Sequence, residues 1–309
     1  MLVHMQPARD GEVEWETRDG PACRTWYTVY GNVDAQPGPV LIGLHGGPGA
    51  GHEYLSPLYD LNHYGIPIVL YDQLGCGRST RFKDRAGDAS FWTIDLFIQE
   101  LDCLIEHLDL RSRGYCLFGQ SWGGVLAGSF AARRPQGLKK LILASAPASF
   151  PLYAEGCRQL LAQLPDDIRK TIEDCERQGD FGSPQFEKAA SVFYSRFFCR
   201  LDPMPDDVQA GFAHLQEDPT CYMTMCGPSE FTITGSLKDW SIGDDAKRIE
   251  VDTLLLNSLF DEAQDICIEP WFAAIPRVKW VTLQNSSHML HWEERDKTIA
   301  LCRRFLLDF

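Results

Sequence analysis

The sequence predicts an α/β protein whose mostly parallel sheet is covered by helices on both faces. Apolar runs of strand length alternate with segments that place apolar residues at helical spacing, both before residue 148 and after residue 250. Between these two parts lies a stretch that is rich in aromatic residues and contains no apolar run of strand length. Strands connected through helices pair in parallel, so the pattern indicates one sheet that a helical insertion interrupts.

Eight runs have the composition of strands, and their order sets the expected architecture. They are residues 13–17, 24–30, 39–44, 66–71, 115–118, 138–144, 251–256 and 278–283. Apolar residues at helical spacing predict helices over residues 93–110, 125–134, 264–274 and 291–307. We therefore expect an eight-stranded sheet in which residues 1–148 and 241–309 form the core and residues 149–240 form a helical cap.

Composition and charge exclude several classes of function. The 309-residue chain is 44% hydrophobic, which is enough for a large core, and its net charge of -14 is unsuited to binding nucleic acid. No apolar run reaches membrane-spanning length, and residues 1–20 lack the apolar region of a signal peptide. We expect a cytoplasmic protein that binds neither nucleic acid nor membrane. The oligomeric state stays open, and a monomer is compatible with the sequence.

The cysteines indicate reduced thiols. The chain has 11 of them, an odd number, and no two stand at the spacing of a zinc or redox motif. The nearest approach to such a motif, Cys221 and Cys226, is too widely spaced. We therefore expect buried thiols that behave as small hydrophobic side chains, and no metal site.

Residues 119–123 (GQSWG) match the G-x-S-x-G pattern of a nucleophilic serine. They lie between the predicted strand 115–118 and the predicted helix 125–134, which is the context that the pattern requires. Small residues on both sides of Ser121 allow a sharp turn that lifts the hydroxyl above the edge of the sheet. The motif in this context predicts the α/β-hydrolase fold, with Ser121 as the nucleophile.

The acid and the base that activate Ser121 are expected after later strands, in the chain order serine, acid, histidine. Asp261 follows the predicted strand 251–256, and His288 follows the predicted strand 278–283. Because the carboxyl ends of parallel strands meet at one edge of a sheet, these side chains are expected to lie near the nucleophile. The sequence therefore predicts a Ser–His–Asp triad.

Three other side chains compete for these roles. His291 is close to His288 but begins the last predicted helix, where packing or capping is its ordinary role. Asp252 lies inside a predicted strand, and Asp265 is placed to cap the helix that follows it. We favour His288 as the base and Asp261 as the acid.

Two backbone segments are placed to bind an oxyanion. Residues 45–49 (HGGPG) directly follow a predicted strand, and loops of this kind present N–H groups in lipases. Gly46 and Gly47 lack side chains that would block a substrate, and the N–H of Trp122 is a second donor at a helix N-terminus. We expect an oxyanion hole formed by Gly46, Gly47 and Trp122.

A second glycine-rich loop, residues 72–79 (DQLGCGRS), follows another predicted strand. Its glycines mark a turn, and Asp72 and Arg78 are placed to pair across it. Cys76 lies in this loop, but no base is indicated for it. We interpret the loop as scaffold.

Together these motifs resemble the prolyl aminopeptidase (proline iminopeptidase) family of α/β hydrolases, which includes the related L-amino acid amidases. The matching motifs are residues 45–49 (HGGPG), 71–79 (YDQLGCGRS), 119–124 (GQSWGG), 260–262 (FDE), 287–288 (SH) and 291–295 (HWEER). The resemblance runs from about residue 24 to the end of the sequence and is weakest in the predicted cap. It implies a serine hydrolase, without metal or cofactor, that cleaves an amide bond next to a free α-amine.

The resemblance also implies a site for the amine of the substrate. In that family two carboxylates hold a free amino terminus, one next to the catalytic aspartate and one from the cap, and Glu262 and Glu230 match these positions. A buried ammonium needs paired negative charge, and such a site rejects substrates with a blocked amine. The implied partner is a small molecule or short peptide with a free amine: the N-terminal residue of a peptide, or an amino-acid amide.

Two alternatives stay open. The same triad serves esterases, lactonases and biosynthetic hydrolases, because a fold does not dictate its substrate. The positions of Glu230 and Glu262 relative to the pocket distinguish these enzymes from an aminopeptidase. The second alternative is a catalytically silent, ligand-binding member of the fold, which the presence of Ser121, Asp261 and His288 disfavours.

Overall fold

All eight predicted strands form in the protein. Their bounds are β1 (Arg9–Glu16), β2 (Ala22–Tyr30), β3 (Val40–Leu44), β4 (Ile68–Tyr71), β5 (Tyr115–Gln120), β6 (Leu138–Ala144), β7 (Asp252–Ser258) and β8 (Val278–Leu283). The structure, a computed structural model, describes residues 9–18, 20–33 and 38–307. Residues 1–8 of the first predicted core segment lie outside the described residues. β6 and β8 have the predicted bounds, and the other strands differ by a few residues at their ends.

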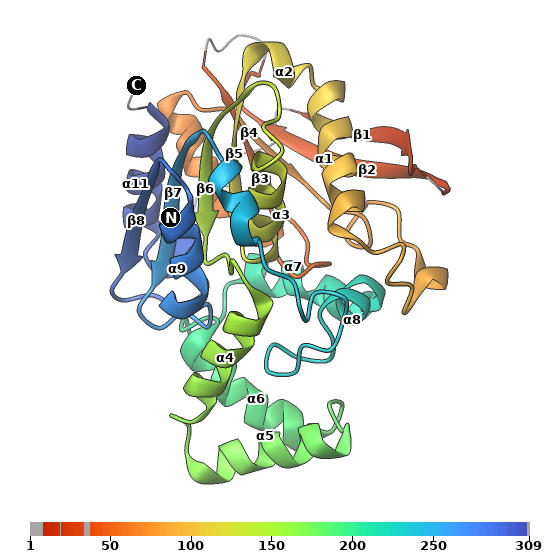
Figure 1. The fold of residues 1–309 in the computed structure, drawn as a ribbon, viewed down its shortest axis with the longest axis vertical. Coiled ribbons are helices and arrows are strands. Elements are labelled where there is room, and N and C mark those ends of the chain that lie inside the picture. The colour runs from red at the N-terminus through yellow and green to blue at the C-terminus, as the bar shows by residue number, and fades with distance from the viewer. Residues whose placement is uncertain (1–8, 19, 34–37, 308–309) are drawn as a thin grey trace.

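The strands pair into one sheet in the order β1-β2-β4-β3-β5-β6-β7-β8 (Figure 1). β1 pairs antiparallel with β2, and β2 pairs antiparallel with β4. The remaining neighbours are parallel. Every residue of β3, β4 and β5 is buried, as expected for strands with helices on both faces. This arrangement confirms the predicted α/β-hydrolase fold.

Helices cover both faces of the sheet. They include α1 (Ile94–His107), α2 (Leu110–Arg113), α3 (Trp122–Ala131), α9 (Asp265–Ala274), α10 (Leu290–Glu293), α11 (Arg295–Leu307) and the 3-10 helices η1 (Glu53–Tyr64), η2 (Lys83–Arg85) and η3 (Gly243–Arg248). Val40, Ile42 and Leu44 of β3 pack in one hydrophobic core with residues of α1 and α3. Leu41 packs in the other core, with residues of η1 and α11. The alternating side chains of one strand therefore serve both faces.

The helical elements differ from the predicted ones at several places. The helix expected over residues 291–307 is divided at Glu294, whose backbone leaves the helical region (φ -122°, ψ 51°). η1 has no counterpart among the predicted elements. Pro57 lies inside it, and a proline in that position removes an N–H from the helical pattern.

The insertion between β6 and β7 contains the helices α4 (Phe150–Leu161), α5 (Asp166–Gln178), α6 (Pro184–Phe197), α7 (Asp206–Glu217) and α8 (Thr220–Met225). It lies below the sheet in Figure 1, with α5 and α6 farthest from the strands. Ser149 and Ser183 cap the first turns of α4 and α6 by accepting backbone N–H groups. Residues 149–240, all of which the structure describes, contain no named strand. The division into core and cap stays an interpretation of this arrangement.

Two general features of the described residues bear on the protein's class. No helix among them combines the length and the apolar composition needed to cross a bilayer. The eleven cysteines all fall in the described part of the chain, and each is a free thiol.

Helix α7 connects the insertion to the core through close contacts with η1. The Gly51 N–H donates to Gly211 O (2.8 Å), and a Cβ atom on Gly211 would lie 3.1 Å from the ring of Tyr54. Because Gly211 has no side chain, α7 can lie this close to Tyr54. One turn further along, His214 Nε2 lies 3.1 Å from Glu53 Oε1. The hydrogen bond to Glu53 is the main cause that raises the pKa of His214 above its usual value of 6.5.

We predict that His214→Gln removes a pH-dependent part of the stability. Because the folded-state pKa of His214 is raised, its contribution is fully present below pH 6.5 and is lost as the pH rises through the raised value. The difference in free energy of unfolding between wild type and variant, measured by urea denaturation, should fall with rising pH from at most about 1 kcal/mol. Gln216→Ala, exposed on the same helix, is the control. A difference that does not change with pH would contradict this role for His214.

Candidate active site

Ser121 lies at a sharp turn between β5 and α3, with a positive φ that non-glycine residues rarely adopt (φ 56°, ψ -125°). Its N–H donates to Ala144 O at the end of β6 (2.9 Å). A Cβ atom on Gly119 would lie 2.3 Å from Gly123 O, and one on Gly123 would lie 2.1 Å from Leu44 O. Only glycine fits at both positions, which gives the G-x-S-x-G spacing its physical basis.

His288 and Asp261 are hydrogen-bonded at the same edge of the sheet. His288 Nδ1 lies 2.8 Å from Asp261 Oδ1, and both side chains are buried. Asp261 Oδ1 also accepts from the N–H of Ala263 (2.8 Å), and Oδ2 accepts from Ser145 Oγ (2.5 Å). Because Nδ1 donates to Asp261, Nε2 of His288 is the atom left to accept a proton. Ser121 and His288 line one cavity, so the structure brings the three predicted residues together.

The competing acid and base candidates lie elsewhere. His291 Nε2 donates to Tyr54 O (3.0 Å), and burial lowers the pKa of His291 to about 3, which keeps it neutral. Asp265 accepts a hydrogen bond from Asn257 Nδ2 (2.6 Å), and Asp252 is exposed at the start of β7. None of the three competitors lies among the residues that line the cavity.

Two consecutive glutamates hold the loop that carries His288. Ser287 Oγ donates to Glu293 Oε1 (2.5 Å), and the Ser287 N–H donates to Glu293 Oε2 (3.2 Å). Ser286 Oγ donates to Glu294 Oε2 (2.9 Å). The two glutamates of the HWEER motif, one at the end of α10 and one directly after it, therefore position the proposed base.

One of the three expected oxyanion donors is already engaged. The Gly46 N–H donates to the hydroxyl of Tyr54 (2.5 Å), which corrects the expectation that Gly46 binds the oxyanion. Gly47 and Trp122 line the cavity together with Ser121. Trp122 is the first residue of α3, so its N–H has no acceptor within the helix. Gly47 and Trp122 therefore remain as the proposed oxyanion donors.

Gln73 belongs to the loop interpreted as scaffold, and it connects the two proposed oxyanion segments. Its Nε2 donates to His45 O (2.8 Å), and its Oε1 accepts from Trp122 Nε1 (2.9 Å). The Gln73 N–H donates to His45 Nε2 (2.9 Å), so His45 carries its proton on Nδ1 and donates to Gly46 O (2.9 Å). Burial lowers the pKa of His45 to about 4, so it serves as a neutral hydrogen-bonding group. Its position as the second polar residue after an apolar strand was the available sequence signal for Gln73.

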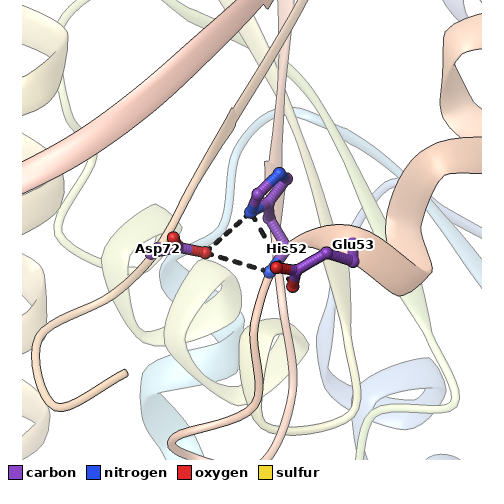
Figure 2. A group of neighbouring side chains, drawn as sticks. All are labelled: His52, Glu53 and Asp72. Atoms are coloured by element: carbon purple, nitrogen blue, oxygen red, sulfur yellow. Dashed lines mark hydrogen bonds and ion pairs between the residues drawn. The ribbon is translucent and has the colours of Figure 1, made fainter. Parts of the chain in front are cut away.

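Figure 2 shows His52, Glu53 and Asp72, the one group in the described part of the chain whose composition suits a metal ion, with donor atoms within 4.8 Å of one another. His52 Nδ1 is hydrogen-bonded to Asp72 Oδ1 (2.7 Å), and the Arg78 N–H donates to Asp72 Oδ2 (3.0 Å). The expected contact between Asp72 and Arg78 thus runs through the backbone, because the guanidinium lies over the ring of Trp26 (4.3 Å). These bonds give the group a structural role in fixing the loop.

The cavity beside Ser121 is small, with a volume of about 40 Å³, and most of its wall is apolar. The apolar side chains of the wall include Phe150, Phe198, Phe212, Leu215 and Ile233. All of these come from the insertion, so the insertion encloses the space above the proposed triad. This enclosed, largely apolar space suits an apolar substrate side chain.

Glu230 and Glu262 also line this cavity, and tyrosine hydroxyls orient both carboxylates. Glu262 Oε1 accepts from Tyr153 (3.0 Å), while Glu230 accepts from Tyr194 (2.5 Å) and Tyr222 (2.8 Å). The other carboxylate oxygen of Glu262, Oε2, is buried and has no hydrogen-bond partner among the described residues. A buried acceptor without a partner indicates a place for a donor from a ligand. The aromatic richness of the insertion was the sequence signal for these tyrosines, but it did not identify them individually.

The protonation states of Glu262 and His288 depend on each other, because His288 Nε2 lies 3.7 Å from Glu262 Oε1. Burial raises the pKa of Glu262, and the nearby carboxylate of Glu230 raises it further. The positive charge of His288 lowers the pKa of Glu262 and so opposes both effects. Burial alone would lower the pKa of His288, but the carboxylates of Glu262 and Asp261 outweigh burial and raise it to about 9. In the substrate-free site these carboxylates therefore favour the doubly protonated form of His288.

Comparisons with known proteins place this geometry in a family. The family model described as alpha/beta hydrolase fold matches residues 39–295, so the chain belongs to the alpha/beta hydrolase fold family. The proline iminopeptidase of Saccharolobus solfataricus is 38% identical over 266 residues, which cover 86% of this chain and 84% of that protein. The proline iminopeptidase of Thermoplasma volcanium is 34% identical over 266 residues, covering 86% and 88%.

Solved structures agree with these relatives. The crystal structure of VinJ is 39% identical, superposes with a TM-score of 0.92, and covers 97% of this chain and 99% of its own. The proline iminopeptidase of Mycobacterium smegmatis is 35% identical with a TM-score of 0.87, covering 96% and 97%. Within the alpha/beta hydrolases the chain belongs to the proline iminopeptidase family, and it is a serine hydrolase. The resemblance seen in the sequence motifs is confirmed.

We predict that Glu262→Gln moves the acid limb of the pH profile of kcat/KM to lower pH. The Glu262 carboxylate raises the pKa of His288, so its removal lowers that pKa, and the neutral base forms at lower pH. The measurement is hydrolysis of p-nitrophenyl acetate, an ester without an amine, so that a loss of amine binding does not obscure the shift. Glu155→Gln, exposed on α4, is the control and should keep the wild-type profile. An unchanged or upward-shifted limb in Glu262→Gln would contradict the assignment.

Proposed function

We propose that the protein is an aminopeptidase that removes a small N-terminal residue, with proline preferred, from short peptides. The observation that carries this proposal is the buried Oε2 atom of Glu262, which lacks a partner among the described residues and belongs to the cavity that Ser121 lines. Similarity to proteins named proline iminopeptidase supports proline as the residue removed.

A substrate ammonium fits the charge provided by Glu230 and Glu262. An N-terminal proline has a secondary ammonium with two N–H donors, which matches two carboxylates. A buried ammonium needs such paired negative charge, whereas an N-acylated substrate would leave both carboxylates without a cation. An amino-acid amide presents the same amine and carbonyl, so it belongs to the same substrate class.

In the proposed acylation step, Ser121 Oγ forms a bond to the substrate carbonyl carbon while His288 Nε2 takes its proton. Asp261 holds His288 with the other proton on Nδ1 and stabilises the imidazolium. The negative charge on the carbonyl oxygen is stabilised by the N–H groups of Gly47 and Trp122. The carbon–nitrogen bond then breaks, and His288 transfers its proton to the leaving amine.

Deacylation repeats the sequence with water. His288 takes a proton from the water molecule as its oxygen bonds to the acyl carbon, and the bond to Ser121 Oγ then breaks. His288 returns the proton to Ser121, and the free amino acid leaves. Apart from the substrate and this water molecule, the proposed scheme uses side chains and backbone groups of this chain.

The substrate amine also affects the base. In the substrate-free protein the Glu262 carboxylate contributes to the raised pKa of His288. A bound ammonium beside Glu262 opposes that effect, so the pKa of His288 falls and a neutral imidazole becomes available. The amine would therefore promote the chemical step as well as binding, which is how an enzyme converts binding energy into rate.

We expect Ser121→Ala to abolish hydrolysis of proline p-nitroanilide, with a loss of about 10⁴-fold or more in kcat, because the nucleophile is removed. Ser129→Ala, in the helix that follows, is the matched control; it loses a hydroxyl that donates to Val125 O (2.8 Å). Circular dichroism checks that both variants are folded. A folded Ser121→Ala protein that retains near wild-type turnover would exclude Ser121 as the nucleophile.

We expect Glu230→Gln to lower kcat/KM for proline p-nitroanilide by about 10- to 100-fold, the usual cost of losing a charge-assisted hydrogen bond. Hydrolysis of p-nitrophenyl acetate, which has no amine, should change much less. The comparison of the two substrates in one variant separates amine recognition from general damage to the site. Equal losses on both substrates would show that Glu230 does not hold the amine.

A further inference from the structure

Tyr54 lies at the centre of the candidate active site, but the proposed reaction scheme gives it no role. It lies in η1, is fully buried, and its ring contacts Phe212 (centroids 5.3 Å apart) in the wall of the cavity. Its hydroxyl accepts the Gly46 N–H (2.5 Å) and donates to Gln120 Oε1 (2.7 Å). Burial raises the pKa of this hydroxyl far above its usual value, so it stays protonated and can serve as donor and acceptor at once.

The bond from the Gly46 N–H to Tyr54 holds the His45–Gly46 peptide, the unit before the one that carries the Gly47 N–H. That next unit, the Gly46–Gly47 peptide, is held by His45, whose Nδ1 donates to Gly46 O (2.9 Å). The carbonyl and the following N–H of a trans peptide point in opposite directions, so the carbonyl held by His45 sets the direction of the Gly47 N–H. A Cβ atom on Gly46 would lie 3.1 Å from Cβ of Ser121, so this peptide passes directly beside the nucleophile.

Tyr54 also reaches the other two loops of the site. Gln120, which accepts from its hydroxyl, directly precedes the nucleophile and donates through Nε2 to His288 O (3.2 Å). The backbone carbonyl of Tyr54 accepts from His291 Nε2 (3.0 Å) and Trp292 Nε1 (2.7 Å), just after the His288 loop. One residue therefore has hydrogen bonds to the oxyanion loop, the nucleophile turn and the segment that carries the base.

We propose that Tyr54 is a positioning residue of the active site: its hydroxyl holds the His45–Gly46 peptide, and this fixes Gly46, from which the next peptide presents the Gly47 N–H to the developing oxyanion. Through its bond to Gln120, the Tyr54 hydroxyl also fixes the position of the Gly46–Gly47 loop relative to Ser121. The proposal rests on the proposed function in one respect, the use of Gly47 and Trp122 as oxyanion donors. It concerns the transition state rather than the recognition of the amine.

Tyr54→Phe tests the proposal, because it keeps the ring and removes only the hydroxyl. We expect kcat for p-nitrophenyl acetate to fall about 10- to 100-fold, less than the loss of an oxyanion donor itself, while KM changes by less than about 3-fold. The second measurement compares inhibition by trifluoroacetophenone, which forms a tetrahedral adduct with a nucleophilic serine, and by acetophenone, which does not. We define the inhibitor ratio as the inhibition constant of acetophenone divided by that of trifluoroacetophenone. This ratio should fall by about the same factor as kcat.

Tyr115→Phe is the matched control. Tyr115 is equally buried, at the start of β5, and its hydroxyl has no hydrogen-bond partner among the described residues. It should leave kcat and the inhibitor ratio unchanged. If Tyr54→Phe does not fold, Gln120→Met removes the other end of the same link and should lower the inhibitor ratio in the same way.

Different results would overturn different conclusions. Folded Tyr54→Phe protein with wild-type kcat, or with a reduced kcat but an unchanged inhibitor ratio, would show that Tyr54 has only a packing role. The same outcome for folded Gln120→Met would overturn the link through Gln120. Wild-type protein that a fluorophosphonate does not label at Ser121 would instead overturn the proposed mechanism, and the positioning role with it.

Discussion

The close approach of backbone around Ser121 is the constraint on which the site depends. Gly119 and Gly123 leave no space for a side chain, so α3 begins directly against the end of β3. This contact sets Trp122 in the first turn of α3, close to the loop that carries Gly47. A larger residue at either glycine would separate helix and loop, and the two N–H groups would no longer converge on one oxygen atom.

Much of the architecture follows from patterns that are local in the sequence. The strands at 138–144 and 278–283 have their predicted bounds, because each is a short run rich in apolar residues bordered by loop residues. The convergence of Ser121, Asp261 and His288 could be predicted, since each follows a strand and the carboxyl ends of parallel strands meet at one edge. Local patterns did not distinguish Glu230 and Glu262 from solvated glutamates, and the family resemblance supplied those positions.

The remaining site residues could not be predicted because their contacts join distant parts of the chain. Ser145 bonds to Asp261 across 116 positions, and Tyr54 bonds to Gln120 across 66. Nothing in the neighbouring sequence records such pairings. The prediction for Gly46 was wrong for the same reason. Gly46 and Gly47 are adjacent glycines that the sequence does not distinguish, and the hydrogen bond from the Gly46 N–H to the Tyr54 hydroxyl is seen only in the structure.

The sheet and the insertion contribute separate parts of this protein, and that separation has an evolutionary consequence. The groups proposed to make and break bonds follow strands of the sheet, whereas the apolar wall of the cavity and Glu230 come from residues 149–240. Substitutions among the apolar wall residues of the insertion can therefore change which substrates fit while leaving the proposed triad in place. Two parts of the insertion are exceptions: Gly211 of α7 packs against Tyr54, and Phe197 O at the end of α6 accepts the N–H groups of Glu262 and His288 (both 3.1 Å). Lineages that diversify in substrate range are expected to keep these two contacts while remodelling the rest of the insertion.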